Sequence, residues 1–341
     1  MDTRTFADNT YRIIKRLGAG GAGTVYLVWH KHLQKLVAIK KQGDGSSACG
    51  IKQGDGSSAC GTYYYAGAQR NEFEALKDVK SRYLPHVYDF ISVDNITFTV
   101  MEYIEGENFD SLLRRGCRFS QPEFVKWYAQ LTSALETLHS HNICHRDIKP
   151  SNIMLRPSGD ICLIDFNSAL VYGNTTKFIS RSLGYSSPEQ YELFERIKNI
   201  SAMKSGIKQP DCGDHRLPGK VSAEDTNDEN KTVFSDIVEL NPATCHPCPP
   251  SIPLCRGVSE KRTGWSSESQ VDWKLSDIYS LGAAMYHILT GKRPRERTPE
   301  VIPIFKLGSF DPNIVSIIEK SMRRDPTERF ASTAELGKAI V

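Results

Sequence analysis

The chain has 341 residues, and its 39% hydrophobic and 24% charged residues are ordinary for two compact globular units. Lys and Arg number 43 against 40 Asp and Glu, and a net charge of only +3 argues against a nucleic-acid-coating protein. No apolar run reaches the roughly 18 residues of a membrane span, and the polar N-terminus lacks a signal-peptide core. The odd number of cysteines, nine, fits free thiols in a reducing compartment. We therefore expect a cytoplasmic protein with no nucleic-acid partner and no membrane contact within this segment.

Strand patterns dominate the first hundred residues. They fall at 11–17, 24–28, 36–40, 86–93 and 96–102. The first two flank a turn with glycines at Gly18, Gly20 and Gly23, where backbone N–H groups can approach phosphate oxygens without a Cβ clash. Because a strand beginning at Thr24 follows, and not a helix, the motif favours a hairpin over nucleotide phosphates rather than a dinucleotide-binding turn. A plain hairpin without a ligand is the alternative.

Two segments interrupt these regular patterns, and the spacing of apolar residues changes from strand-like to helical. Residues 41–50 recur unchanged at 52–61, and their Gly and Ser content predicts a flexible loop. A helical pattern occupies 69–80, and after residue 103 helical periods prevail. Ser120 and Glu123 predict a capping box before one buried helix, and Gly291 ends a second core helix. The chain therefore divides into a strand-rich lobe and a helical lobe.

The second interruption, about 192–270, lacks a sustained period and is rich in acidic residues and proline, so we expect a long, mostly irregular insertion. It contains residue types that bind Zn²⁺ at knuckle-like spacing, namely Cys212, His215, Cys245, Cys248 and Cys255. Two interpretations stay open. The knuckles close a tetrahedral Zn²⁺ site that orders the loop, or the segment is a proline-rich loop with free thiols.

The strongest signal is the run from His145 to Asn152, which reads His-Arg-Asp-Ile-Lys-Pro-Ser-Asn, followed by Asp165-Phe-Asn. Related motifs stand at 184–190 and 276–282. With the glycine turn and Lys40, this ordered set resembles the eukaryotic-type (Hanks-type) Ser/Thr protein kinases, most closely the bacterial branch. The resemblance covers about residues 11–191 and 271–335.

The resemblance implies an α+β, bilobal protein-kinase fold, with an antiparallel N-lobe sheet plus one regulatory helix and a mainly helical C-lobe. We place the N-lobe at 1–101 with the duplicated insert at 41–61, the hinge at 102–106, and the C-lobe at 107–341. It also implies transfer of the γ-phosphate of ATP to Ser/Thr hydroxyls of protein substrates, with Mg²⁺ or Mn²⁺. The alternative is a pseudokinase scaffold that binds nucleotide and presents the second insert to a partner.

The resemblance also assigns roles to the catalytic loop. Asp147 matches the catalytic base, which takes the proton of the acceptor hydroxyl, and Lys149 would neutralise the γ-phosphoryl oxygens. Asn152 and Asp165 supply the oxygen ligands that Mg²⁺ prefers. Asn167 departs from the family, which has glycine there; asparagine tolerates a left-handed backbone, so we expect Asp165 to keep its role.

In the N-lobe, Lys40 would contact the phosphates, with Glu72 as its ion-pair partner. Counting back from Leu84 favours Glu72 over Glu74. The residues expected around the nucleotide are Gly18, Gly20, Gly23, Val25, Ala38, Lys40, Met101, Glu102 and Tyr103.

Two further expectations concern regulation and architecture. Arg146 often meets a phosphorylated activation loop in this family, and the hydroxyls available for autophosphorylation are Thr175, Thr176, Ser180 and Ser182. The alternative is that these are ordinary polar loop residues. Glu189 should pair with Arg329, and Asp277 should anchor the catalytic-loop backbone.

Overall fold

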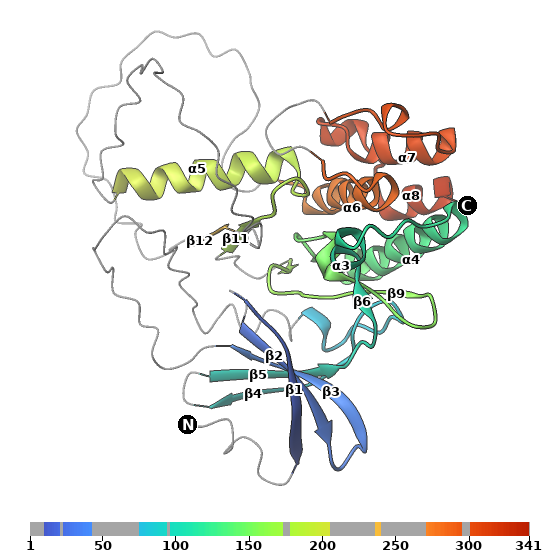
Figure 1. Ribbon diagram of the computed structural model, residues 1–341. Helices are drawn as coiled ribbons and strands as arrows, with labels where there is room; N and C mark the ends of the chain where they lie inside the picture. Colours follow the sequence, from blue (N-terminus) through green and yellow to red (C-terminus); the bar gives the residue numbers. More distant parts are fainter. Residues whose placement is uncertain are drawn as a thin grey trace, which may run out of the picture.

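The computed structural model describes residues 10–20, 23–42, 75–93, 96–172, 178–204, 236–239, 271–294 and 301–340. A twisted sheet lies at one end of the molecule and a group of helices at the other, as Figure 1 shows. This arrangement confirms the bilobal α+β fold that the sequence predicts. Among the described residues, none of the helices combines the length and apolar character needed to cross a bilayer.

The sheet has five antiparallel strands in the order β1-β2-β3-β5-β4. They are β1 (Tyr11–Gly20), β2 (Gly23–His30), β3 (Lys35–Gln42), β4 (Val87–Val93) and β5 (Ile96–Glu102). All five strands were predicted, but β3 continues two residues further, so Lys41 and Gln42 belong to the sheet and not to the duplicated insert. The lobe has its own small apolar core, which includes Val28, Val37 and Val100.

The glycine turn closes the hairpin between β1 and β2, as predicted. Gly20 pairs with Gly23, and Gly18 pairs with Val25. Gly23 has a φ of 113°, and a Cβ there would lie 2.3 Å from the carbonyl oxygen of Lys41. Glycine is therefore required at this position, because the neighbouring strand passes too close for any side chain.

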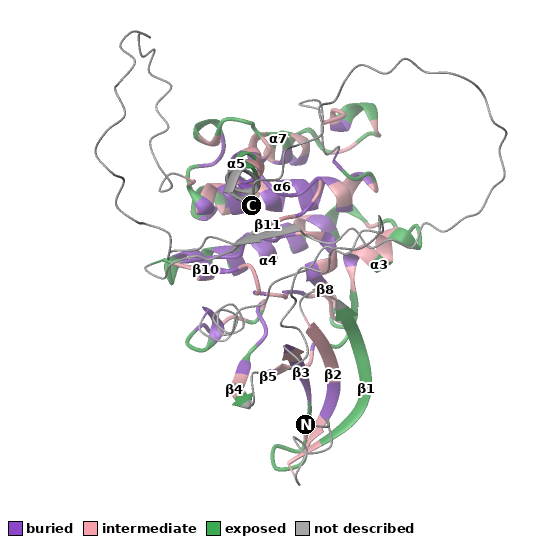
Figure 2. Cartoon of the chain, turned by 90° about the vertical axis from the view of Figure 1, so that its left-hand side faces the viewer, coloured by how far each residue is buried: buried purple, intermediate pink, exposed green. Residues whose placement is uncertain are grey.

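The second lobe is mainly helical. Its helices are α3 (Phe109–Arg114), α4 (Gln121–Ser140), α5 (Pro188–Lys204), α6 (Trp273–Thr290), α7 (Pro312–Ser321) and α8 (Thr333–Ile340), with 3-10 turns η1 (Pro150–Asn152), η3 (Ile304–Lys306) and η4 (Pro326–Glu328). Its short strands are β6 (Glu107–Asn108), β7 (Ile143–Cys144), β8 (Ile153–Leu155), β9 (Ile161–Leu163), β10 (Leu170–Val171), β11 (Phe178–Arg181) and β12 (Asp236–Glu239). Helices α4 and α6 form the buried centre (Figure 2).

Local signals set the ends of these two central helices. Ser120 and Glu123 form the predicted reciprocal capping box, which satisfies two free amides at the start of α4. Gly291 ends α6 in a left-handed conformation with a φ of 67°.

The second insertion begins later than the sequence predicts. Helix α5 continues to Lys204, so residues 192–204 are helical and not irregular. Leu193, Ile197 and Ile200 do recur at helical spacing, but over only two turns, and the proline-rich segment that follows hid this signal. Further along, strand β12 pairs antiparallel with β11, so part of the insertion joins the segment that follows Asp165.

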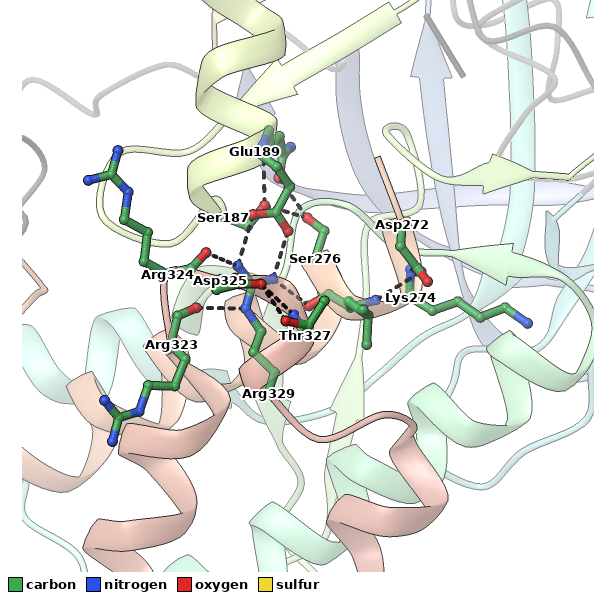
Figure 3. A network of polar contacts seen from close by, with 12 residues as sticks. Ser187, Glu189, Asp272, Lys274, Ser276, Arg323, Arg324, Asp325, Thr327 and Arg329 are labelled. Atoms are coloured by element: carbon green, nitrogen blue, oxygen red, sulfur yellow. Dashed lines mark hydrogen bonds and ion pairs between the residues drawn. The ribbon is translucent and has the colours of Figure 1, made fainter. Parts of the chain in front are cut away.

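A buried ion pair joins the start of α5 to the C-terminal part of the lobe, as predicted (Figure 3). Arg329 donates to both carboxylate oxygens of Glu189, at 2.7 and 2.9 Å. The same guanidinium donates to the carbonyls of Leu275, Arg323 and Arg324. Because both side chains are almost fully buried, each charge depends on the other for compensation.

We predict that Arg329→Met lowers the free energy of unfolding by about 3–5 kcal/mol, because it leaves a buried carboxylate without a partner. Glu189→Gln should cost less, since the amide oxygen still accepts one bond. Urea unfolding monitored by circular dichroism measures both. The control is Glu192→Gln on the same helix, whose carboxylate is exposed and 3.9 Å from Arg324, and which should stay within about 0.5 kcal/mol. Equal unfolding midpoints for Arg329→Met and the control would contradict the prediction.

His287 on α6 makes a partly buried polar contact, with its Nδ1 lying 2.7 Å from the hydroxyl of Tyr185. Burial, followed by the nearby charge of Arg293, lowers the pKa of His287 from 6.5 to about 4. The imidazole is therefore neutral in the folded protein at neutral pH.

This pKa predicts acid sensitivity. Between pH 6.5 and 4 the unfolded chain protonates this histidine and the folded protein does not, so the free energy of unfolding falls as the pH falls through that window. At about 1.36 kcal/mol per pH unit, the loss by pH 5 is about 2 kcal/mol. His287→Gln keeps an acceptor for Tyr185 but cannot titrate. The stability difference between pH 7.5 and pH 5 should therefore be smaller in the variant; an identical difference in both proteins would refute this account.

Candidate active site

One face of the sheet carries the residues predicted around a nucleotide. Ala38 pairs with Met101 on β5, and Lys40 pairs with Val25 on β2. Paired residues of antiparallel strands share a face, and so do residues two apart along a strand. Val25, Ala38, Lys40 and Met101 therefore lie together, on the face from which Lys40 reaches the helical lobe at Asp165.

The chain leaves the sheet through Glu102 and Tyr103. The carboxylate of Glu102 accepts from Arg156 at 3.0 Å and from the amide of His86 at 3.2 Å. The Glu102 amide itself donates to the carbonyl of His86 at 2.7 Å. These bonds fix the connection between the two lobes and commit the acidic side chain away from a ligand role.

The catalytic loop is held by one buried carboxylate. Asp277 on α6 accepts from the backbone amides of His145 and Arg146, each at 2.8 Å, which confirms the predicted anchor. His139 lies 3.0 Å from the same carboxylate. Arg146 has a φ of 62°, a strained conformation for a residue with a side chain, and it persists because these bonds hold the loop.

The loop brings together the predicted catalytic side chains. Lys149 lies 2.9 Å from one carboxylate oxygen of Asp147, and the hydroxyl of Ser182 donates to the other. Lys149 also donates to the Ser182 hydroxyl at 3.0 Å. Asn152 donates through its amide nitrogen to the backbone carbonyl of Asp147 at 2.8 Å and to its carboxylate at 3.2 Å. Four side chains thus form one network around the predicted base.

Asp165 lies near Lys149, whose charge acts on its carboxylate. Its Oδ1 accepts from the Lys40 ammonium at 3.0 Å, a contact between residues 125 positions apart. Asp165 has a φ of 69°, and the next residue, Phe166, is buried with its ring 4.7 Å from that of His145. Burial alone would raise the pKa of Asp165, but the charge of Lys40 and its bond outweigh burial and hold the pKa below its usual range. The carboxylate is therefore ionised.

Asn152 and Asp165 fit a hard cation. The amide nitrogen of Asn152 is used by Asp147, which leaves its oxygen as the ligand atom. Asp165 contributes an ionised carboxylate. Oxygen donors of this kind are what Mg²⁺ and Mn²⁺ bind.

Arg146 contacts the segment that follows Asp165, and its predicted contact with a phosphorylated loop stays a prediction, because Thr175 and Thr176 lie outside the described residues. Its side chain is buried, donates through Nε to the carbonyl of Ser168 at 2.6 Å, and lies 4.9 Å over the ring of Trp273. Burial lowers the pKa of Arg146 to about 10, so it remains charged at neutral pH. In this arrangement the guanidinium packs against the first turn of α6.

Several predicted residues lie outside the described part of the chain. They are Glu72, Thr175, Thr176 and the zinc candidates Cys212, His215, Cys245, Cys248 and Cys255. Among the described residues, His139, Cys144 and Asp277 are close enough to hold a metal ion. The Asp277 carboxylate there already accepts two loop amides, so we assign that cluster to the anchor of the catalytic loop.

Two polar contacts near the site were not predicted from the sequence. Gln42 donates to the side chain of Asn167 at 2.9 Å, and Arg181 donates to Glu195 on α5 at 2.6 Å. Side chains alternate between the two faces of a strand, so Gln42 could have been placed on the same face as Lys40. The end of β3 was not predicted, because the repeat that starts at residue 41 overlaps it. No comparable signal in the sequence marks the pair between β11 and α5, because it depends on tertiary contact.

Comparison with known proteins agrees with this geometry. The protein kinase domain model matches residues 11–199. Serine/threonine-protein kinase OXI1 of Arabidopsis thaliana is 25% identical over 341 residues, which is 96% of this chain and 73% of that kinase. Serine/threonine-protein kinase PknA of Nostoc sp. is 25% identical over 98% of this chain and 47% of its own length. A probable serine/threonine-protein kinase, PknB of Lactococcus lactis, is 29% identical over 55% of this chain and 28% of its own length. Since the family model covers more than half of the sequence, the chain belongs to the protein kinase family, and its motifs and relatives place it with the Hanks-type Ser/Thr kinases.

Proposed function

We propose that this chain transfers the γ-phosphate of ATP to Ser/Thr hydroxyls of proteins. The observation that carries the proposal is the convergence of Asp147, Lys149, Asn152 and Asp165 with Lys40 from the opposite lobe. Phosphoryl transfer passes through a loose transition state, so an enzyme contributes chiefly position and charge neutralisation. This cluster offers both.

Each side chain has a distinct task in the proposal. Asp147 accepts the proton of the attacking hydroxyl, and Lys149 beside it balances charge on the transferred group. Lys40 contacts the phosphates and is held at the cleft by Asp165, with Glu72 as a further expected partner. Asn152 and Asp165 would hold Mg²⁺, or Mn²⁺ in its place, which supplies charge neutralisation at the phosphate oxygens. The glycine turn of β1 and β2 covers the phosphates.

A Ser/Thr acceptor has support from the hydroxyl of Ser182, which contacts both Asp147 and Lys149. A serine hydroxyl can therefore donate to the predicted base, as the hydroxyl of a substrate would. The relatives named above are serine/threonine kinases. Autophosphorylation at Thr175 or Thr176 remains part of the proposal; Ser182 is the weaker candidate because it is buried in this network.

The scaffold alternative has less support, because the predicted base contacts Lys149 and Asn152, and the predicted metal ligand Asp165 contacts Lys40. Zinc binding by the second insert is a separate hypothesis that concerns its cysteines and His215. We also place the proposed activity in the cytoplasm, where ATP is available and the buried thiols Cys144 and Cys162 stay reduced.

The test is incorporation of γ-labelled phosphate from ATP and Mg²⁺ into the chain itself and into a generic protein substrate. We expect wild type to label both, with phosphoserine or phosphothreonine recovered. Asp147→Asn, which removes the base, should lower the rate about 10²–10⁴-fold. Its melting temperature should stay near that of wild type, which excludes misfolding. Equal and negligible labelling by wild type and variant would favour the scaffold.

Ser182 offers a second prediction. Ser182→Ala removes the hydroxyl that bridges Asp147 and Lys149, so we expect kcat to fall about tenfold or more, as for loss of one oriented bond to a charged group. Ser182→Thr keeps the hydroxyl and should retain most of the activity. Steady-state kinetics on a peptide substrate measures both variants. Full activity in Ser182→Ala would remove this residue from the proposed machinery.

A further inference from the structure

Asn167, which replaces the glycine of the family, makes two directed side-chain contacts. Its amide nitrogen donates to Oδ1 of Asp165 at 2.7 Å. Its amide oxygen accepts from the side-chain nitrogen of Gln42 at 2.9 Å. Gln42 is the last residue of β3 and is buried. A glycine at position 167 could make neither contact.

Two bonds reach Oδ1 of Asp165: one comes directly from β3, and the other comes from Asn167, which β3 holds in turn. Lys40 donates to this oxygen directly at 3.0 Å, and Gln42 acts on it through Asn167. Lys40 and Gln42 are two residues apart on β3, so their side chains leave the strand on one face. The carboxylate is thus oriented from two directions by one rigid element.

Such orientation matters because the backbone at Asp165 is strained. Its φ of 69° lies in the left-handed region, which a residue with a Cβ adopts only when its surroundings impose it. Two hydrogen bonds to the carboxylate supply such a restraint. Both end on Oδ1, so neither uses Oδ2 as its acceptor.

We propose that Asn167 and Gln42 are positioning residues for Asp165, which they hold toward the cleft in a conformation ready to bind Mg²⁺ with the nucleotide. The inference rests on the proposed function, in which Asp165 is a metal ligand. Preorganisation of this kind reduces the cost of ordering the carboxylate when the ligand arrives. Its loss should therefore weaken Mg²⁺-dependent nucleotide binding.

The experiment compares wild type with Asn167→Ala, Gln42→Met and the double variant. Calorimetry measures the binding of a non-hydrolysable ATP analogue as a function of Mg²⁺ concentration. Amide hydrogen exchange of residues 165–168 is measured without nucleotide. We expect each single variant to raise the half-saturating Mg²⁺ concentration about three- to tenfold and to speed exchange at 165–168. The double variant should be no worse than the worse single variant, because both substitutions break the same chain of bonds.

A matched control is Lys41→Met, which alters the neighbouring side chain on the opposite face of β3 and should leave both measurements unchanged. Asn167→Gly, which restores the residue of the family, should behave like Asn167→Ala in Mg²⁺ dependence. Wild-type Mg²⁺ dependence and exchange in Gln42→Met would overturn the proposal. So would effects of the two single variants that multiply in the double variant, or nucleotide binding by wild type that does not depend on Mg²⁺.

These measurements need no phosphoryl transfer. If wild type binds nucleotide with Mg²⁺ but labels no substrate, the proposed function fails while the positioning role is still decided by binding and exchange. If transfer occurs and the variants match wild type, only the positioning role fails.

Discussion

The contact between Lys40 and Asp165 is the constraint on which the rest of the site depends, since it joins the sheet directly to the predicted metal ligand of the helical lobe. Its ammonium is almost fully buried, and burial of a cation is costly unless a counter-charge is held in place. The sheet must therefore position Lys40 accurately, and the helical lobe must position Asp165. The sheet does so through β3, which lies in the middle of the strand order with neighbours on both sides.

The helical lobe positions Asp165 through a series of bonds that lead back to α6. Asp277 fixes the amides of His145 and Arg146, and the ring of His145 in turn contacts the carbonyl of Ile164 at 3.2 Å. The amide of Ile164 donates to the carbonyl of Asn152 at 2.8 Å. A single buried carboxylate thus orders both the loop of the predicted base and the segment of the predicted metal ligand.

Much of this arrangement follows from the sequence because its signals are local. The alternation of apolar and polar residues predicts the five strands, and the capping box at Ser120 predicts the start of α4. The fixed spacing of the motifs predicts the roles of Asp147 and Asp165. What the sequence could not predict depends on contacts between distant elements. The packing of Arg146 against Trp273 joins residues on either side of the long insertion, and no periodicity reports it. The length of α5 was missed because its apolar pattern is short.

The packing of Arg146 bears on how the segment after Asp165 is held. The guanidinium packs against Trp273 and donates to the carbonyl of Ser168, so it joins the start of that segment to α6. Arg181 bonds to Glu195 and lies 4.7 Å from the ring of Phe194, both on α5. Its strand, β11, also pairs with β12 from the insertion. Ser182 directly follows β11 and donates to the predicted base, Asp147. The four residues of β11 therefore connect strand β12 of the insertion to the catalytic loop.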